Sequence, residues 1–115
     1  MRKVLAFAVI GLLLGTVLFL SRTAKANEYA QGKKLYNDKC LICHGAKGDG
    51  NGPAASAFSP KPANFTDPKF WHGDVDKKIT DTIENGHGMM PAFELKPAEI
   101  KDIIDYLSHT FKPPQ

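Results

Sequence analysis

Two cysteines and a histidine lie within five consecutive residues, Cys40-Leu41-Ile42-Cys43-His44. Two thiols at this spacing can each form a thioether with one vinyl group of a haem, and the adjacent imidazole then lies beneath the iron as a ligand. The pentad therefore predicts one haem c, attached covalently through Cys40 and Cys43, with His44 as an axial ligand. Since no other catalytic cluster is visible, we expect the chain to move electrons and not to be an enzyme.

A Cys-x-x-Cys pair also occurs in redox dithiols and in zinc sites. A zinc site needs two more ligands at paired spacing, but the chain has no other cysteine, and His72, His87 and His109 are scattered singly. A thiol–disulfide oxidoreductase of the thioredoxin kind needs a βαβ pattern around the motif, and none is visible. A haem-free oxidoreductase remains an alternative of a different class.

The N-terminus has the pattern of a signal peptide. Residues 1–20 begin with two positive charges and continue as an uncharged, mostly apolar run, and Ala24-Lys25-Ala26 supplies small residues at a cleavage site. We therefore expect residues 1–26 to be a signal peptide cleaved after Ala26, residues 27–115 to be one domain, and the protein to be periplasmic. An uncleaved anchor is the alternative, because the run is near the shortest length that can span a bilayer.

The positive charge of the whole sequence belongs to this N-terminal segment. The sequence contains 15 Lys plus Arg and 12 Asp plus Glu, a formal charge of +3. Four basic residues and no acidic residue lie in residues 1–26, so the remainder carries 11 Lys against 12 acidic side chains, a charge of −1. No basic stripe with interleaved aromatic residues is present, so nothing indicates a nucleic-acid partner.

Apolar spacing predicts three helices, over about residues 28–39, 76–85 and 97–110. In each of them apolar residues recur every three or four positions, which places them on one face of a helix. An aspartate can cap the start of the second helix, and Gly86 suits its C-terminal end. The first helix leads directly into the pentad.

The segment between His44 and Val75 is punctuated by glycine and proline and has no predicted helix or strand. A loop of about thirty residues is too long for an ordinary compact domain, but it is reasonable if it encloses a large cofactor. The predicted fold class is therefore all-α, with three main helices and long loops around one covalently bound haem. We expect a monomer.

The second axial ligand would decide the potential and reactivity of the iron. The candidates are Met89, Met90 and the three histidines outside the pentad. A methionine raises the potential and closes the iron to small molecules, a second histidine lowers the potential, and an open position permits gas binding or peroxidase-like chemistry. Both methionines lie in the glycine-rich segment Gly86–Phe93, and adjacent loop residues cannot both face one iron.

From Asn27 to Thr110 the chain resembles a bacterial class I c-type cytochrome, a small soluble monohaem electron carrier. The matching segments, in family order, are the helix with Gly32 and Tyr36, the pentad with Gly45, Gly48–Pro53, Lys61–Phe65, Asn85-Gly86, Met90–Phe93 and the helix with Ile103 and Tyr106-Leu107. The resemblance implies the cytochrome c fold, with the first and last helices crossing closely at Gly32. It also implies that Met90, directly before Pro91, is the sixth ligand rather than Met89.

The resemblance implies further roles around the haem. Pro53 is the candidate for the backbone carbonyl that accepts the free imidazole N–H of His44 and so orients the ring. Asn64 and Trp71 are candidates for hydrogen-bond donors to the haem propionates, although Trp71 could equally be a core aromatic residue.

The implied function is electron transfer between redox partner proteins, which would be a membrane respiratory complex or a periplasmic oxidoreductase. A dedicated haem subunit of a larger enzyme is one alternative. A sensor or peroxidase-like protein with an exchangeable sixth ligand is another.

Overall fold

The structure is a computed structural model that describes residues 26–114. Apart from Ala26, the predicted signal peptide lies outside the described residues. Within residues 26–114, no helix combines the length and the apolar character needed to cross a membrane.

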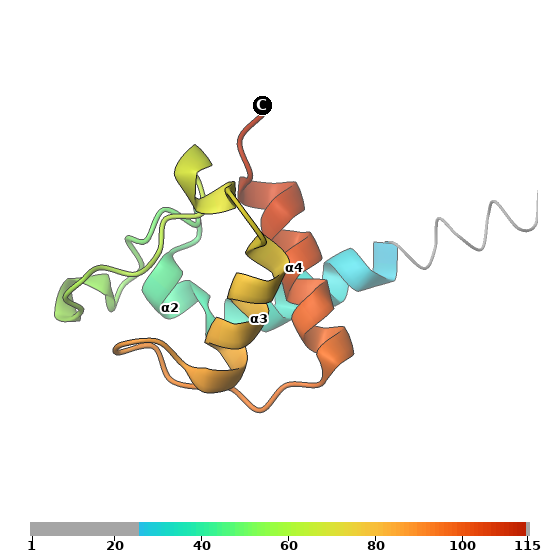
Figure 1. Cartoon of the computed structure of the whole chain (residues 1–115), viewed down its shortest axis with the longest axis horizontal. Helices are drawn as coiled ribbons and strands as arrows, with labels where there is room; N and C mark the ends of the chain where they lie inside the picture. The colour runs from blue at the N-terminus through green and yellow to red at the C-terminus, as the bar shows by residue number, and fades with distance from the viewer. Residues whose placement is uncertain (1–25, 115) are drawn as a thin grey trace, which may run out of the picture.

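Helices form the regular structure of the described residues (Figure 1). In chain order they are the N-terminal helix of residues 26–39, α2 (Leu41–His44), the 3-10 helices η1 (Ala55–Ala57) and η2 (Pro68–Trp71), α3 (Val75–Asn85) and α4 (Pro97–Phe111). Residues 26–114 contain no strand beyond one isolated bridge between His87 and Met90. The all-α prediction is confirmed, and each long helix ends within two residues of its predicted limits. The short elements α2, η1 and η2 were not predicted.

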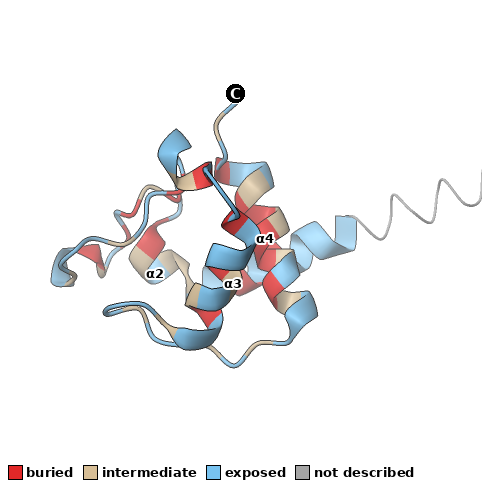
Figure 2. Ribbon diagram, viewed as in Figure 1, coloured by how far each residue is buried: buried red, intermediate tan, exposed pale blue. Residues whose placement is uncertain are grey.

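The long helices share one hydrophobic core, which Figure 2 shows as the red faces turned toward one another. The buried residues of α3 and α4 are Val75, Ile79, Ile83, Ile100, Ile103, Ile104, Tyr106, Leu107 and Phe111. All of them except Tyr106 are positions that the three- and four-residue spacing placed on one helix face. At the start of α3, the Asp74 carboxylate accepts the Lys77 backbone N–H (3.2 Å), and Gly86 ends the helix with a φ of 73°.

The outer face of each long helix carries one Lys–Asp pair four residues apart. The pairs are Lys34–Asp38, Lys77–Asp81 and Lys101–Asp105. Their side chains lie at the surface, where such pairs contribute little to stability. Their main effect is to place opposite charges next to each other along the surface of the helix.

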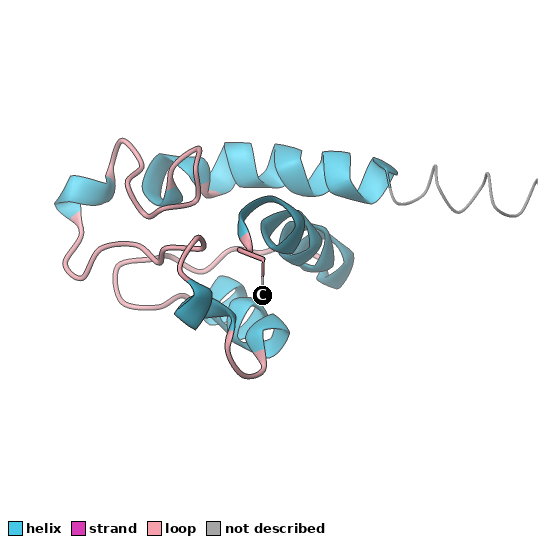
Figure 3. Cartoon of the chain, turned by 90° about the horizontal axis from the view of Figure 1, so that it is seen from above, coloured by secondary structure: helices cyan, strands magenta, loops and turns pink. Residues whose placement is uncertain are grey.

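The N-terminal helix crosses α4 at Gly32 (Figure 3). A Cβ atom built on Gly32 would lie 2.0 Å from the backbone oxygen of Asp102 and 2.9 Å from the Cβ of Tyr106. Because the nearest atoms belong to the backbone of the other helix, no side-chain rotation could relieve the overlap. The close crossing expected at Gly32 is confirmed.

Substitution of Gly32 by alanine is therefore expected to destabilise the protein. Alanine would add about 1 kcal/mol of helix propensity, but overpacking this crossing should cost about 1–3 kcal/mol or more. Denaturant unfolding of Gly32→Ala should show a lower midpoint than that of the unmodified protein. Gln31→Ala, at the exposed neighbouring position, is the control and should leave the midpoint within error. A Gly32→Ala variant as stable as the control would show that the helices do not meet at this distance.

Candidate functional site

The N-terminal helix leads into the pentad through one turn of backbone. The Cys40 N–H donates to the carbonyl of Tyr36 (2.9 Å), and the N–H groups of Cys43 and His44 return to the Cys40 carbonyl (3.2 and 2.9 Å). Both cysteines are free thiols with part of their surface exposed, and Ile42 between them is 57% exposed. Neither sulfur atom is in a disulfide, so both thiols are free to form thioether bonds.

The Cys40 thiol does not have the low pKa of a nucleophilic cysteine in a redox dithiol. Burial raises the pKa of the Cys40 thiol to about 11, with nearby Lys39 lowering it and Cys43 raising it further. Such a thiol is protonated at neutral pH, whereas oxidoreductases of the thioredoxin kind depress the pKa of their nucleophilic cysteine. Residues 26–114 also contain no group of three or more His, Cys, Asp or Glu side chains that could hold a metal ion. Neither the dithiol nor the zinc interpretation gains support.

His44 is buried and oriented by a backbone carbonyl. Its Nδ1 atom lies 3.0 Å from the carbonyl oxygen of Ala63. Because a carbonyl can only accept, Nδ1 donates the proton in this bond, and the lone pair of Nε2 is left for a metal. Burial lowers the pKa of His44, opposed by the hydrogen bond to Ala63. The imidazole is therefore held neutral, which is the state a metal ligand requires.

The structure corrects the predicted acceptor of this hydrogen bond, which is Ala63 and not Pro53. After the pentad the chain folds back on α2, and the N–H groups of Gly52 and Ala54 donate to α2 carbonyls (3.0 and 2.9 Å). These bonds leave Pro53 exposed, and a later pass of the loop brings Ala63 to His44. The proline nearest in sequence is thus not the nearest acceptor in space.

Phe65 packs flat against the imidazole of His44. The two ring centroids are 4.6 Å apart, and the ring planes differ by 19°. The Phe65 N–H donates to the carbonyl of Gly48 (2.7 Å). The same short segment that hydrogen-bonds His44 therefore also covers one face of its ring, a contact that sequence reasoning did not predict.

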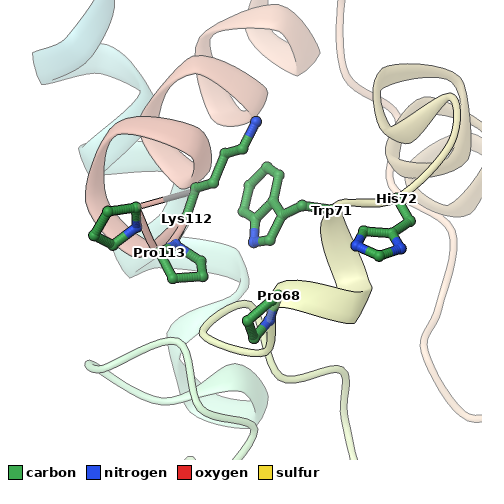
Figure 4. A pocket seen from close by; sticks show the side chains of 6 residues that line it. Pro68, Trp71, His72, Lys112 and Pro113 are labelled. Carbon is green, nitrogen blue, oxygen red and sulfur yellow. The ribbon is translucent and has the colours of Figure 1, made fainter.

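Trp71 belongs to the core next to this segment. It is 8% exposed, and its indole N–H donates to the Phe65 carbonyl (2.8 Å). Because that bond occupies the single donor of the indole, the predicted role of Trp71 as a propionate donor is contradicted, and the core interpretation holds. Its outer edge lines a surface pocket (Figure 4). The other lining residues are Pro68, His72, Lys112, Pro113 and Pro114.

Asn64 remains available as a donor. Its side-chain oxygen accepts the backbone N–H and the hydroxyl of Thr66 (2.8 and 2.7 Å). The side chain is exposed, and the hydrogen bonds to Thr66 use its oxygen and not its NH₂ group. The propionate role of Asn64 stays a prediction.

The two methionines of the loop between α3 and α4 differ in environment. His87 and Met90 exchange backbone hydrogen bonds (3.0 and 2.9 Å) that close a tight turn. Met90 packs, partly buried, against the core, whereas Met89 at the turn is 57% exposed. A Cβ on Gly86 would lie 2.8 Å from the Met90 carbonyl oxygen, so glycine allows this close approach. Burial therefore favours Met90 over Met89 as a ligand.

These donors suit a haem c. The chain offers two free thiols, a neutral buried imidazole and a thioether, and Figure 1 shows the loop after α3 projecting to the same end of the molecule as α2. The Phe93 N–H donates to the Ile83 carbonyl (2.8 Å), which ties this loop to α3. Apolar residues only partly covered by the core are Cys40, Leu41, Phe70, Met90, Phe93 and Leu95. Partly covered apolar side chains in both segments are what a large apolar cofactor requires.

The end of α2 is fixed by Tyr36. The Tyr36 hydroxyl donates to the Gly45 carbonyl (2.6 Å) from a side chain that is 1% exposed. Burial raises the pKa of this phenol, so it stays protonated and remains a donor. The bond joins the first helix to the residue that follows His44.

Comparisons with known proteins place the chain in a family. A family model described as Cytochrome c matches residues 29–111. The cbb3-type cytochrome c oxidase subunit FixP of Bradyrhizobium diazoefficiens is 33% identical over 88 residues, covering 74% of this chain and 28% of that protein. Subunit CcoP of Rubrivivax gelatinosus is 31% identical over 98 residues, covering 77% and 30%. Cytochrome c6 of Synechocystis sp. is 27% identical over 96 residues, covering 82% and 75%.

The chain spans less than a third of the length of the two oxidase subunits. No solved structure matches it.

Replacing Tyr36 by phenylalanine should destabilise the protein without removing the cofactor. The substitution removes one of the two donors to the buried Gly45 carbonyl, which keeps the Gly48 N–H (3.0 Å), so the loss should be that of one hydrogen bond, about 0.5–1.5 kcal/mol. Denaturant unfolding should report this loss, and the visible spectrum should keep its shape. Tyr29→Phe is the matched control, because the Tyr29 hydroxyl lies 3.3 Å from the Thr110 hydroxyl at an exposed position. Equal stability of the two variants would contradict the role given to the Tyr36 bond.

Proposed function

Because this chain belongs to the cytochrome c family, we propose that it is an exported electron carrier whose haem iron is ligated by His44 and Met90. The observation that carries the proposal is the pair of candidate ligands: a neutral, buried imidazole and a thioether packed against the core, each in a segment tied to a helix. The chain contains a single Cys-x-x-Cys-His segment. We therefore assign it one haem c.

The haem, when bound, supplies one-electron chemistry at its iron. Cys40 and Cys43 would hold it by two thioether bonds, and His44 would offer a nitrogen whose basicity is raised by the hydrogen bond to Ala63. Met90 offers a soft, neutral sulfur that favours ferrous over ferric iron and so raises the potential. Because His44 and Met90 would both hold the iron, it would offer no open position to a substrate, and we infer that the protein is a carrier and not an enzyme.

Apolar side chains near the cofactor segments provide the contact surface for redox partners. Ile42, between the two cysteines, and Met89, beside the ligand, are each 57% exposed. The near-neutral charge of residues 27–115 allows only modest electrostatic steering. Docking therefore relies in part on these apolar side chains, and the partners are a membrane respiratory complex or a periplasmic oxidoreductase.

A second candidate function is that of a haem subunit within a larger oxidase assembly. It is favoured by the 33% and 31% identities to subunits FixP and CcoP. Purification of the affinity-tagged protein from its own organism separates the two candidates. A free carrier elutes as a monomer, and a subunit elutes with stoichiometric partner chains.

Met90 and Met89 can be compared directly by substitution. Met90→Ala should abolish the absorption band that marks sulfur ligation of ferric haem, lower the reduction potential, and open the iron to cyanide or carbon monoxide, because its thioether is the ligand. Met89→Ala is the matched control and should keep the band and the potential. A normal ferric spectrum in Met90→Ala would overturn the assignment, and a loss confined to Met89→Ala would transfer it to Met89.

Export can be tested on the protein produced in a host that assembles c-type cytochromes. The periplasmic product should begin at Asn27, because cleavage follows Ala26, and its mass should include one covalently retained haem. Intact-protein mass spectrometry measures both quantities. Variants Cys40→Ala and Cys43→Ala should each lose one thioether bond. A full-length product in the membrane fraction would support the anchor alternative instead.

A further inference from the structure

We propose that Phe65 is a positioning residue for His44, whose stacked ring fixes the plane of the imidazole relative to the iron. This inference rests on the proposed function, since it concerns His44 as an axial ligand. Through the orientation of His44, Phe65 would influence the electronic properties of the haem iron.

The hydrogen bond to Ala63 cannot fix the imidazole plane by itself. It holds the direction of the Nδ1–H bond (3.0 Å to the carbonyl oxygen), but the ring can still rock about that direction. The terminal torsion of a histidine side chain is intrinsically broad, so the chain must supply the missing restraint. The Phe65 ring supplies it, because it lies 4.6 Å from His44, centroid to centroid, and only 19° from coplanar.

Phe65 can restrain the rotation of the His44 imidazole because the Phe65 side chain and backbone are themselves held in place. Its N–H donates to Gly48 (2.7 Å), and its carbonyl accepts the Trp71 indole N–H (2.8 Å). The Phe65 ring also lies 5.0 Å from the ring of Phe70 and 6.3 Å from that of Phe111, centroid to centroid. The side chain is 6% exposed. A ring restrained in this way cannot follow a rotation of the imidazole, so it opposes that rotation.

The orientation of an axial imidazole matters because its π orbital selects which iron d orbital holds the unpaired electron of the ferric state. A flexible side chain at position 65 would let the imidazole rock over a wider range. The spectroscopic signature of the ferric iron would then shift or broaden, although the ligands stay the same. A residue with a merely structural role would not move this signature.

The test compares holoprotein variants that remove an aromatic ring from the same cluster. Phe65→Leu and Phe65→Met replace the flat ring next to His44 by flexible side chains, and two variants are used in case one fails to assemble. Tyr106→Leu is the matched control, because Tyr106 belongs to the same hydrophobic core but, among the rings of residues 26–114, stacks on neither Phe65 nor His44. The measurements are the ferric electron paramagnetic resonance g values, the haem-methyl NMR shifts, the reduction potential and the unfolding midpoint.

We expect both kinds of variant to lose stability, but only the Phe65 variants to shift the g values and the haem-methyl pattern. Wild-type spectra in the Phe65 variants, or an equal shift in Tyr106→Leu, would overturn the inference. Failure of the proposed function has a different signature: the unmodified protein would itself lack the sulfur-ligation band. The comparison at Phe65 would still report on His44 in that case, because the pentad supplies this ligand whichever group occupies the sixth position.

Discussion

The close crossing of the N-terminal helix over α4 at Gly32 is the contact on which the rest of the structure depends. Beyond the crossing, the first helix continues into the pentad and so determines where Cys40 lies. Past the same crossing, α4 ends at Phe111, whose ring packs near that of Phe65 and fills the space beside Gly48, where a Cβ would come within 2.7 Å. One point of helix contact therefore influences both the position of the pentad and the position of the Phe65 ring beside His44.

The loop between α2 and α3 is ordered by backbone contacts rather than by a core of its own. Its first pass returns to α2, where the Gly50 N–H donates to the His44 carbonyl (2.9 Å). Its second pass lies directly against the first, as shown by the distance of only 2.5 Å between a Cβ built on Gly50 and the Pro62 carbonyl oxygen. Gly50 also has a positive φ of 76°. Glycine is required here both for the left-handed backbone and for the close approach. This packing of two loop passes carries Ala63 and Phe65 to the imidazole.

Local patterns in the sequence predict the long helices and the cofactor attachment, because periodicity and the Cys-x-x-Cys-His spacing are properties of neighbouring residues. Contacts that depend on the path of the loop could not be predicted in the same way. Pro53 was expected to orient His44 because it follows the pentad closely, but Ala63 does so from a later pass of the chain. The hydrogen bond of Trp71 to Phe65 is equally non-local. The only sequence signal for the contacts of Ala63 and Phe65 with His44 was the segment Lys61–Phe65. The family resemblance included this segment without giving Ala63 or Phe65 a role.

The Lys–Asp pairs on the three long helices shorten the range of the electrostatic field of the charges they contain. Two opposite charges one helical turn apart form a small dipole, whose field falls off more steeply than that of a single charge. At physiological ionic strength the field of a lone surface charge already fades over roughly 8 Å, and that of a neutralised pair reaches less far. The interaction of each pair with a distant charge should therefore depend less on salt concentration than that of a lone surface charge.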